Sequence, residues 1–135
     1  MAHRHVVSFT LIAAVATING AATAAPAKVD AYYSKTYTEC MKTGVSTMEM
    51  RDCISAEHDQ WDAALNQIYQ TLMGSRTPAE KTELRNDERA WLKRQKAECD
   101  HAGDDEQGGS LQNVEIDQCY LDETIRRTVY LRSLH

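Results

Sequence analysis

The clearest hydrophobic pattern of this chain lies between residues 84 and 99. Side chains recur there at steps of three and four residues, so they share one face of an α-helix. These side chains are Leu84, Glu88, Trp91, Leu92, Gln95 and Cys99. A large aromatic near the middle of such a face is usually a core residue, although it can also be an exposed contact for a partner. We expect Trp91 to anchor the core and Cys99 to form one half of a disulfide.

Similar spacing and helix-start signals predict the other helices. Ser46 and Glu49 have the spacing of a capping box, and Thr77 and Glu80 repeat that spacing. The predicted helices span residues 36–42, 47–73, 78–101 and 111–133. The chain shows no strand-like alternation and no internal repeat. We therefore predict an all-α fold, a small helical hairpin or bundle of about four helices that two disulfides staple together.

The first residues have the features of a secretory signal peptide. A weakly basic start precedes an apolar run over residues 6–18, and Ala22-Thr23-Ala24 fits a cleavage site. The apolar run is too short for a membrane anchor. We expect residues 1–24 to be removed, residues 25–35 to form a flexible leader, and residues 36–135 to form one helical domain. This organisation predicts a periplasmic or secreted protein with no membrane span in the mature chain.

Cysteine usage agrees with export. The chain has 4 cysteines, all after residue 24, and an even count in a small exported domain indicates disulfides. Four cysteines allow three pairings. We favour Cys40–Cys53 and Cys99–Cys119, because each pair flanks a predicted turn between helices and can close locally. The spacing lacks a C-x-x-C motif, which argues against a zinc site or a thioredoxin-like redox role.

Charge narrows the class of partner. The chain has 20 acidic and 15 basic residues, with a formal net charge of −5. Removal of residues 1–24 makes the charge more negative, because Arg4 is the one charged residue of that segment. An acidic surface argues against binding to nucleic acid or to anionic lipid. It is compatible with a basic protein partner.

The search for catalytic chemistry finds no enzyme signature. The histidines lack metal-ligand spacing on any one helix, and Gly108-Gly109-Ser110 is too short for a phosphate-binding loop and follows no strand. Asp59 and Asp62 share a helix face, but a solvated face explains them. We expect no enzymatic activity and no cofactor. Some polar residues near apolar faces are expected to hydrogen-bond one another or a loop backbone, or else to contact a partner. These residues are Asn66, Tyr69, Arg89, Thr124 and Arg127.

Several short motifs occur together in a characteristic order. They are Cys40 with Cys53; Leu65-Asn66 with Tyr69; Arg89-Ala90-Trp91-Leu92 with Cys99; Gly108-Gly109-Ser110; Cys119; and Thr124 with Arg127. In their order and spacing, residues 37–131 resemble the lysozyme inhibitor LprI-type family of exported bacterial proteins. The chain departs from the family pattern after the tryptophan, where Gln95 and Lys96 replace the usual Arg-Asp pair. We expect the salt bridge of that pair to be missing or rerouted.

The resemblance implies a binding protein that inhibits lysozyme in the bacterial envelope. An acidic inhibitor would associate faster with a basic lysozyme through electrostatic steering. The alternative function is an envelope structural or stress-associated protein with a partner other than lysozyme. The candidate binding segment is the polar loop between the last two cysteines, with an acidic rim and a neutral tip. Its residues are Asp104, Asp105, Glu106, Gln107, Gly108, Gly109 and Ser110.

Overall fold

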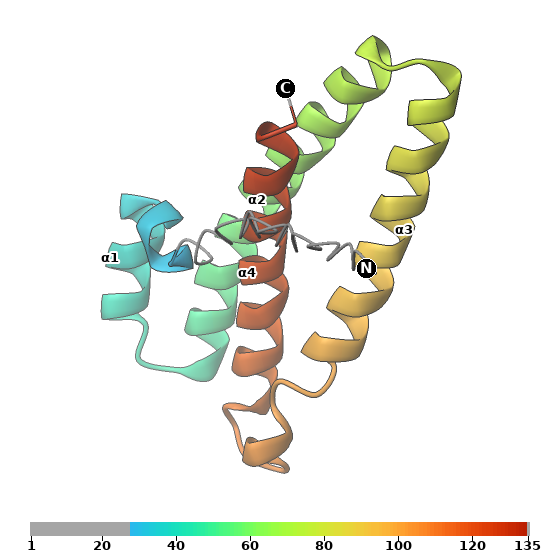
Figure 1. Cartoon of the computed structure of the whole chain (residues 1–135). Helices are drawn as coiled ribbons and strands as arrows, with labels where there is room; N and C mark the ends of the chain where they lie inside the picture. Colours follow the sequence, from blue (N-terminus) through green and yellow to red (C-terminus); the bar gives the residue numbers. More distant parts are fainter. Residues whose placement is uncertain (1–27, 135) are drawn as a thin grey trace, which may run out of the picture.

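The computed structural model describes residues 28–134, so the predicted signal peptide lies outside the described residues. These residues form four α-helices and two short 3-10 helices, without a strand among them, which confirms the all-α prediction (Figure 1). The elements are η1 (Val29–Tyr32), α1 (Lys35–Thr43), α2 (Thr47–Ser75), α3 (Pro78–Cys99), η2 (Asp104–Glu106) and α4 (Gln112–Arg132). Within residues 28–134, every helix is too short or too polar to cross a membrane.

The two long helices of the hairpin begin where the capping signals place them. At the start of α2, the Ser46 side chain accepts a hydrogen bond from the Glu49 N–H, and the Glu49 carboxylate accepts one from the Ser46 N–H. Thr77 and Glu80 form the same reciprocal pair at the start of α3. Each box satisfies backbone donors that the first helical turn leaves without a partner.

Helix α4 is the central element of the fold. It runs in the same direction as α2 and opposite to α3, and it packs against both helices (Figure 1). Its fully buried face consists of Leu121, Ile125, Thr128 and Leu131, each with 0% exposure. The short helix α1 packs beside α2. Helices α2 and α3 therefore pack mainly against α4 and only weakly against each other.

The apolar side chains form two clusters along this frame. One cluster joins η1 and α1 to the first half of α2 and to α4. Its buried members are Val29, Tyr37, Cys53, Ile54, Val114, Leu121 and Ile125. The second joins the other half of α2 to α3 and the end of α4; its buried members are Leu65, Leu72, Leu84, Trp91 and Leu131. Trp91 is 8% exposed, so it lies in the core of the second cluster.

Both disulfides have the expected pairing. Cys40–Cys53 joins α1 to α2 across a sequence separation of 13, and Cys99–Cys119 joins α3 to α4 across a separation of 20. The Cα–Cα distances, 5.8 Å and 5.3 Å, lie in the normal range for disulfides. By the chain-entropy model, closing loops of this length stabilises the fold by about 3 kcal/mol each.

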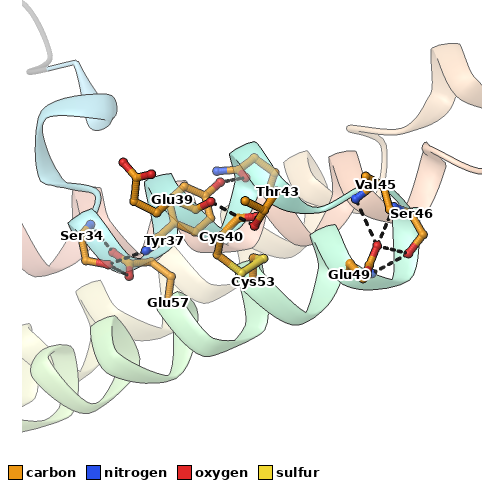
Figure 2. The surroundings of a disulfide bond; sticks show 11 residues. Ser34, Tyr37, Glu39, Cys40, Thr43, Val45, Ser46, Glu49, Cys53 and Glu57 are labelled. Atoms are coloured by element: carbon orange, nitrogen blue, oxygen red, sulfur yellow. Dashed lines mark hydrogen bonds between the residues drawn. A yellow bond between two sulfur atoms is a disulfide. The ribbon is translucent and has the colours of Figure 1, made fainter.

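The prediction of a flexible leader over residues 25–35 is wrong for residues 28–35. Val29 is 5% exposed, and η1 packs against α4. The Ser34 hydroxyl caps α1, and the Ser34 backbone N–H and hydroxyl both donate to the Glu57 carboxylate of α2 (Figure 2). The Tyr33 hydroxyl donates to Asp122 of α4 at 2.6 Å. Long-range hydrogen bonds thus make this segment part of the domain.

Candidate partner-binding loop and the groove beside it

The candidate loop, residues 104–110, lies at one end of the molecule, where α3 turns into α4 (Figure 1). All of its residues are exposed. The Cys99–Cys119 disulfide ties the last residue of α3 to α4 and so closes the base of the connection. The loop is therefore presented to solvent from a covalently fixed base.

Glycines set the shape of this connection at two positions. Gly108 has a φ of +74°, a conformation that side chains with a Cβ rarely adopt. Gly103 is buried, and a Cβ on it would lie 2.5 Å from the backbone oxygen of Gln112, so only glycine permits this close approach. Around Gly108, the Gly109 N–H donates to the Glu106 backbone oxygen at 2.7 Å and closes the turn after η2.

The acidic side of the loop keeps free carboxylates. Asp104 lies 3.0 Å from the Nδ1 of His101, whereas the carboxylates of Asp105 and Glu106 accept no hydrogen bond from residues 28–134. Asp100, at the base, accepts hydrogen bonds from Lys96 and from the Tyr120 hydroxyl, and these bonds lower the pKa of its carboxyl below the ordinary value. Asp100 thus anchors the base, and the two free carboxylates remain available to a cation.

Six of the motif residues gather elsewhere, around a groove of about 330 Å³ formed by α2, α3 and α4. The motif residues that line it are Leu65, Asn66, Tyr69, Trp91, Leu92 and Thr124. Tyr120 also lines the groove, and its hydroxyl donates to Asp100, so the groove ends near the base of the loop. Asn66 holds the rim in place by donating to the backbone oxygen and the carboxylate of Asp62, both at 2.9 Å.

Two motif residues of α3 point away from the core. Leu92 is 49% exposed, and Arg89 is exposed and makes no hydrogen bond or ion pair with residues 28–134. The expectation that Leu92 shares the buried face of Trp91 is wrong. Among the described residues, Arg89 lacks the structural hydrogen bond expected of it, which leaves the alternative of contact with a partner. Successive helical residues are turned by about 100°, so Leu92 leaves the face of Trp91. The buried positions of α3 recur at steps of three and four: Leu84, Trp91, Gln95 and Cys99.

Arg127 lies on the other side of Trp91, where its buried guanidinium joins a partly exposed ion-pair cluster. Its guanidinium donates to Glu88 at 2.6 Å and to Asp87 at 2.7 Å, and it stacks 5.5 Å from the centre of the Trp91 ring. The Tyr130 ring lies 5.1 Å from the same guanidinium. The cluster joins α3 to α4 and gives Arg127 a structural role.

Gln95 and Lys96, which stand where the family pattern has an Arg-Asp pair, make other bonds in place of the expected salt bridge. Gln95 is 7% exposed and donates to the Thr124 hydroxyl at 3.3 Å and to the Tyr120 backbone oxygen at 3.4 Å. Lys96 pairs with Asp100 one turn later. Neutral hydrogen bonds thus connect α3 to α4 at position 95, and the ion pair at position 96 lies within α3 and its cap.

The sequence analysis did not identify Glu57 of α2 as a buried polar residue. Glu57 is 2% exposed and accepts hydrogen bonds from Ser34 and from the Trp61 indole N–H. The available signal was its position on the apolar face of α2, between Ile54 and Trp61. Among residues 28–134, no three His, Cys, Asp or Glu side chains lie together in a way that could hold a metal ion.

Comparison with known proteins gives the family. The model of the family described as lysozyme inhibitor LprI matches residues 38–131. The chain belongs to this family. It is also 26% identical to the uncharacterised protein R02472 of Rhizobium meliloti (strain 1021), over 71% of this chain and 78% of that protein. No solved structure matches the chain significantly. The matched region contains α2, α3, most of α1 and α4, and all four disulfide-bonded cysteines.

Proposed function

We propose that this LprI family member is an exported protein that binds a basic lysozyme and inhibits it by protein–protein contact. Membership of a lysozyme inhibitor family supports a binding role, and two disulfides in a small domain support export. The observation that carries the choice of surface is the exposed acidic loop, residues 104–110, above the Cys99–Cys119 clamp.

Charge gives the loop a role in association. Asp105 and Glu106 have carboxylates without hydrogen-bond donors among the described residues, so their charge acts on approaching cations. Such fields raise association rates by roughly 10- to 1,000-fold, and salt screens them. A basic lysozyme would therefore meet this end of the molecule more often than a neutral protein would.

Shape gives the loop a role in blocking. The cleft of a glycoside hydrolase contains catalytic carboxylates, so a neutral tip suits the cleft better than an acidic one. Residues 107–110 carry no charge, and the positive φ of Gly108 makes a tight turn. We infer that this neutral tip enters the cleft while the acidic residues face the basic rim. The fixed base lowers the entropy lost when the loop is ordered on binding.

Neutralising the acidic side of the loop tests this function. We expect Asp104→Asn, Asp105→Asn and Glu106→Gln together to weaken inhibition about tenfold at low salt, mainly through slower association. Stability should change little, because these side chains are exposed. The measurement is lysis of bacterial cell walls by a panel of basic lysozymes, with and without the purified mature protein, at two salt concentrations.

A matched control separates the loop from net charge. The changes Asp30→Asn, Asp59→Asn and Glu83→Gln remove the same charge from exposed positions outside the loop. They should leave most of the inhibition intact. If no lysozyme is inhibited by a stoichiometric excess at low salt, the inhibitor function is wrong. If both triple variants inhibit like the unchanged protein, inhibition stands and the choice of loop is wrong.

A further inference from the structure

Two large apolar side chains at the start of α2 are unusually exposed. Val45 is 89% exposed and Met48 is 70% exposed, the highest fractions among the exposed large hydrophobic residues. Single exposed apolar residues are ordinary on protein surfaces. These two lie three residues apart in sequence, on either side of the N-cap Ser46, so both lie at the start of α2. The exposure of two such side chains at one helix start therefore needs an explanation, either in local folding or in binding.

Local folding does not supply that reason. Val45 precedes the capping residue Ser46, the position from which an apolar side chain normally packs against the fourth helical residue, Met50. Met50 packs against the core cluster instead, and Val45 remains almost fully exposed. The contact that would give Val45 a structural role is therefore not made.

The backbone that carries these two side chains is nevertheless firmly held. The Glu49 carboxylate accepts hydrogen bonds from the Val45 N–H at 3.1 Å, from the Ser46 N–H at 2.9 Å and from the Ser46 hydroxyl at 2.8 Å (Figure 2). The Cys40–Cys53 disulfide also ties α1 to α2, on either side of the connection that contains Val45 (Figure 2). A pre-organised apolar contact of this kind loses little entropy on binding.

The pair lies at the same end of the molecule as the candidate loop (Figure 1). Helices α2 and α4 start at the same end of the molecule, and the loop directly precedes α4 (Figure 1). Arg51 bonds to Asp117 at 2.6 Å and joins the early turns of the two helices. Met48 borders a hollow of about 480 Å³ there, which Asp52 also lines, and Asp52 forms no ion pair with residues 28–134. Asp52 is thus a free carboxylate beside Met48, next to the Arg51–Asp117 ion pair.

We propose that Val45 and Met48 form an apolar anchor for the same basic protein that the loop at residues 104–110 attracts. This inference rests on the proposed function and extends its contact surface to a second segment. Binding surfaces commonly combine a small apolar centre with a charged rim, and the centre holds most of the binding energy. The loop sets the association rate, and the anchor sets the lifetime of the complex.

The test uses the mature protein and a lysozyme that it inhibits. The double variant Val45→Thr, Met48→Gln keeps the shape of Val45 and a good helix former at position 48. We expect its complex to dissociate about tenfold faster or more, with an unchanged association rate and unchanged salt dependence. The acidic-loop variant should show the opposite pattern. Leu92→Gln, an equally polar change at another exposed apolar residue, is the control and should bind normally. Circular dichroism checks that each variant is folded.

Four other outcomes would contradict the inference that Val45 and Met48 anchor the lysozyme. An unchanged dissociation rate in the double variant, with inhibition by the unchanged protein intact, refutes this inference and leaves the proposed function standing. An equal loss in Leu92→Gln means that the effect is not specific to this corner. A dimer that the double variant loses in sedimentation, with lysozyme binding intact, assigns the pair to a second copy of the chain. If the unchanged protein binds no lysozyme, the proposed function fails and this inference fails with it.

Discussion

At the scale of single residues, Arg127 has the most demanding environment. Its side chain is 5% exposed, and it faces Glu88, which is 14% exposed, and Asp87. Removing the cation would leave a largely buried carboxylate without its partner, which costs several kcal/mol in comparable pairs. We expect Arg127→Met to lower the free energy of unfolding by about 3 kcal/mol, measured by urea denaturation at neutral pH.

The neighbouring residue provides the matched control for this prediction. Arg126 pairs with Glu123 one turn away, but its side chain is 47% exposed. An exposed pair within one helix contributes little, so Arg126→Met should change the free energy of unfolding by less than about 0.5 kcal/mol. Equal effects of the two substitutions would show that burial of the Arg127 cluster does not matter.

Residue-level prediction succeeded where helical periodicity decides burial. The spacing of Leu84, Trp91 and Cys99 placed them on one face, and all three are buried. The prediction that Leu92 is buried was wrong, because apolar character alone does not reveal on which side of Trp91 the neighbouring helix lies. The burial of Glu57 was missed for a different reason. Two of the three donors to its carboxylate come from Ser34, which is 23 residues away in sequence, and the third is the Trp61 indole N–H.

At the scale of elements, the two capping boxes make the stability of the starts of α2 and α3 depend on pH. Hydrogen bonds from the Ser46 side chain, the Ser46 backbone and the Val45 backbone lower the pKa of Glu49. Hydrogen bonds from the Thr77 backbone and side chain do the same for Glu80. A carboxyl with a lower pKa in the folded state stabilises that state above its unfolded pKa. This contribution is lost as the pH falls through the lower, folded pKa.

The double variant Glu49→Gln, Glu80→Gln should expose this dependence. We expect it to be less stable than the unchanged protein above about pH 5, where both carboxyls are ionised in either state. The difference should shrink as the pH falls below about 4, because the unchanged protein then loses the same charges. Urea denaturation at several pH values measures it. A difference that stays constant down to acid pH would rule out the capping carboxylates as its source.

Element prediction was accurate at helix starts and less so elsewhere. Capping boxes are local, so Ser46 and Thr77 could be recognised from a few neighbouring residues. The last turn of α3 ends at Cys99 rather than near His101. The 3-10 helix Val29–Tyr32 was missed altogether, because its stability comes from packing against α4, far away in sequence.

At the scale of the whole molecule, the fold depends on what α4 joins. It buries one face against α2 and α3, it carries Cys119, and it holds the N-terminal segment through Gln118 and Asp122. The sequence predicted the helices and both disulfides because those features are local. It did not predict the central place of α4, whose apolar pattern is the least regular, or the groove that the motif residues share. Both depend on how helices pack rather than on spacing within one helix.

Two tyrosines report on the attachment of the N-terminal segment. The Tyr33 hydroxyl donates to Asp122, and the Tyr37 hydroxyl donates to Gln118, each at 2.6 Å. Burial raises the pKa of both phenols above the ordinary value, and for Tyr33 the hydrogen bond to Asp122 raises it further. A raised pKa means that the fold favours the neutral phenol. The resulting stability is fully present below the unfolded pKa of about 10 and is lost as the pH rises toward the folded pKa.

Alkaline titration of the folded protein therefore tests whether residues 28–37 are integral to the domain. We expect a late component of the tyrosinate absorbance to appear together with loss of helical circular dichroism. The same chain unfolded in urea should lack this component. The folded double variant Tyr33→Phe, Tyr37→Phe should retain only the part that comes from Tyr120, whose pKa is also raised by burial and by its hydrogen bond to Asp100. If the folded protein instead ionises all 6 tyrosines in one transition near that of the unfolded chain, with its helices intact, the segment is not anchored through these phenols. Coincidence of the two signals would mean that ionising Tyr33 and Tyr37 releases contacts on which α4 and the first core cluster depend.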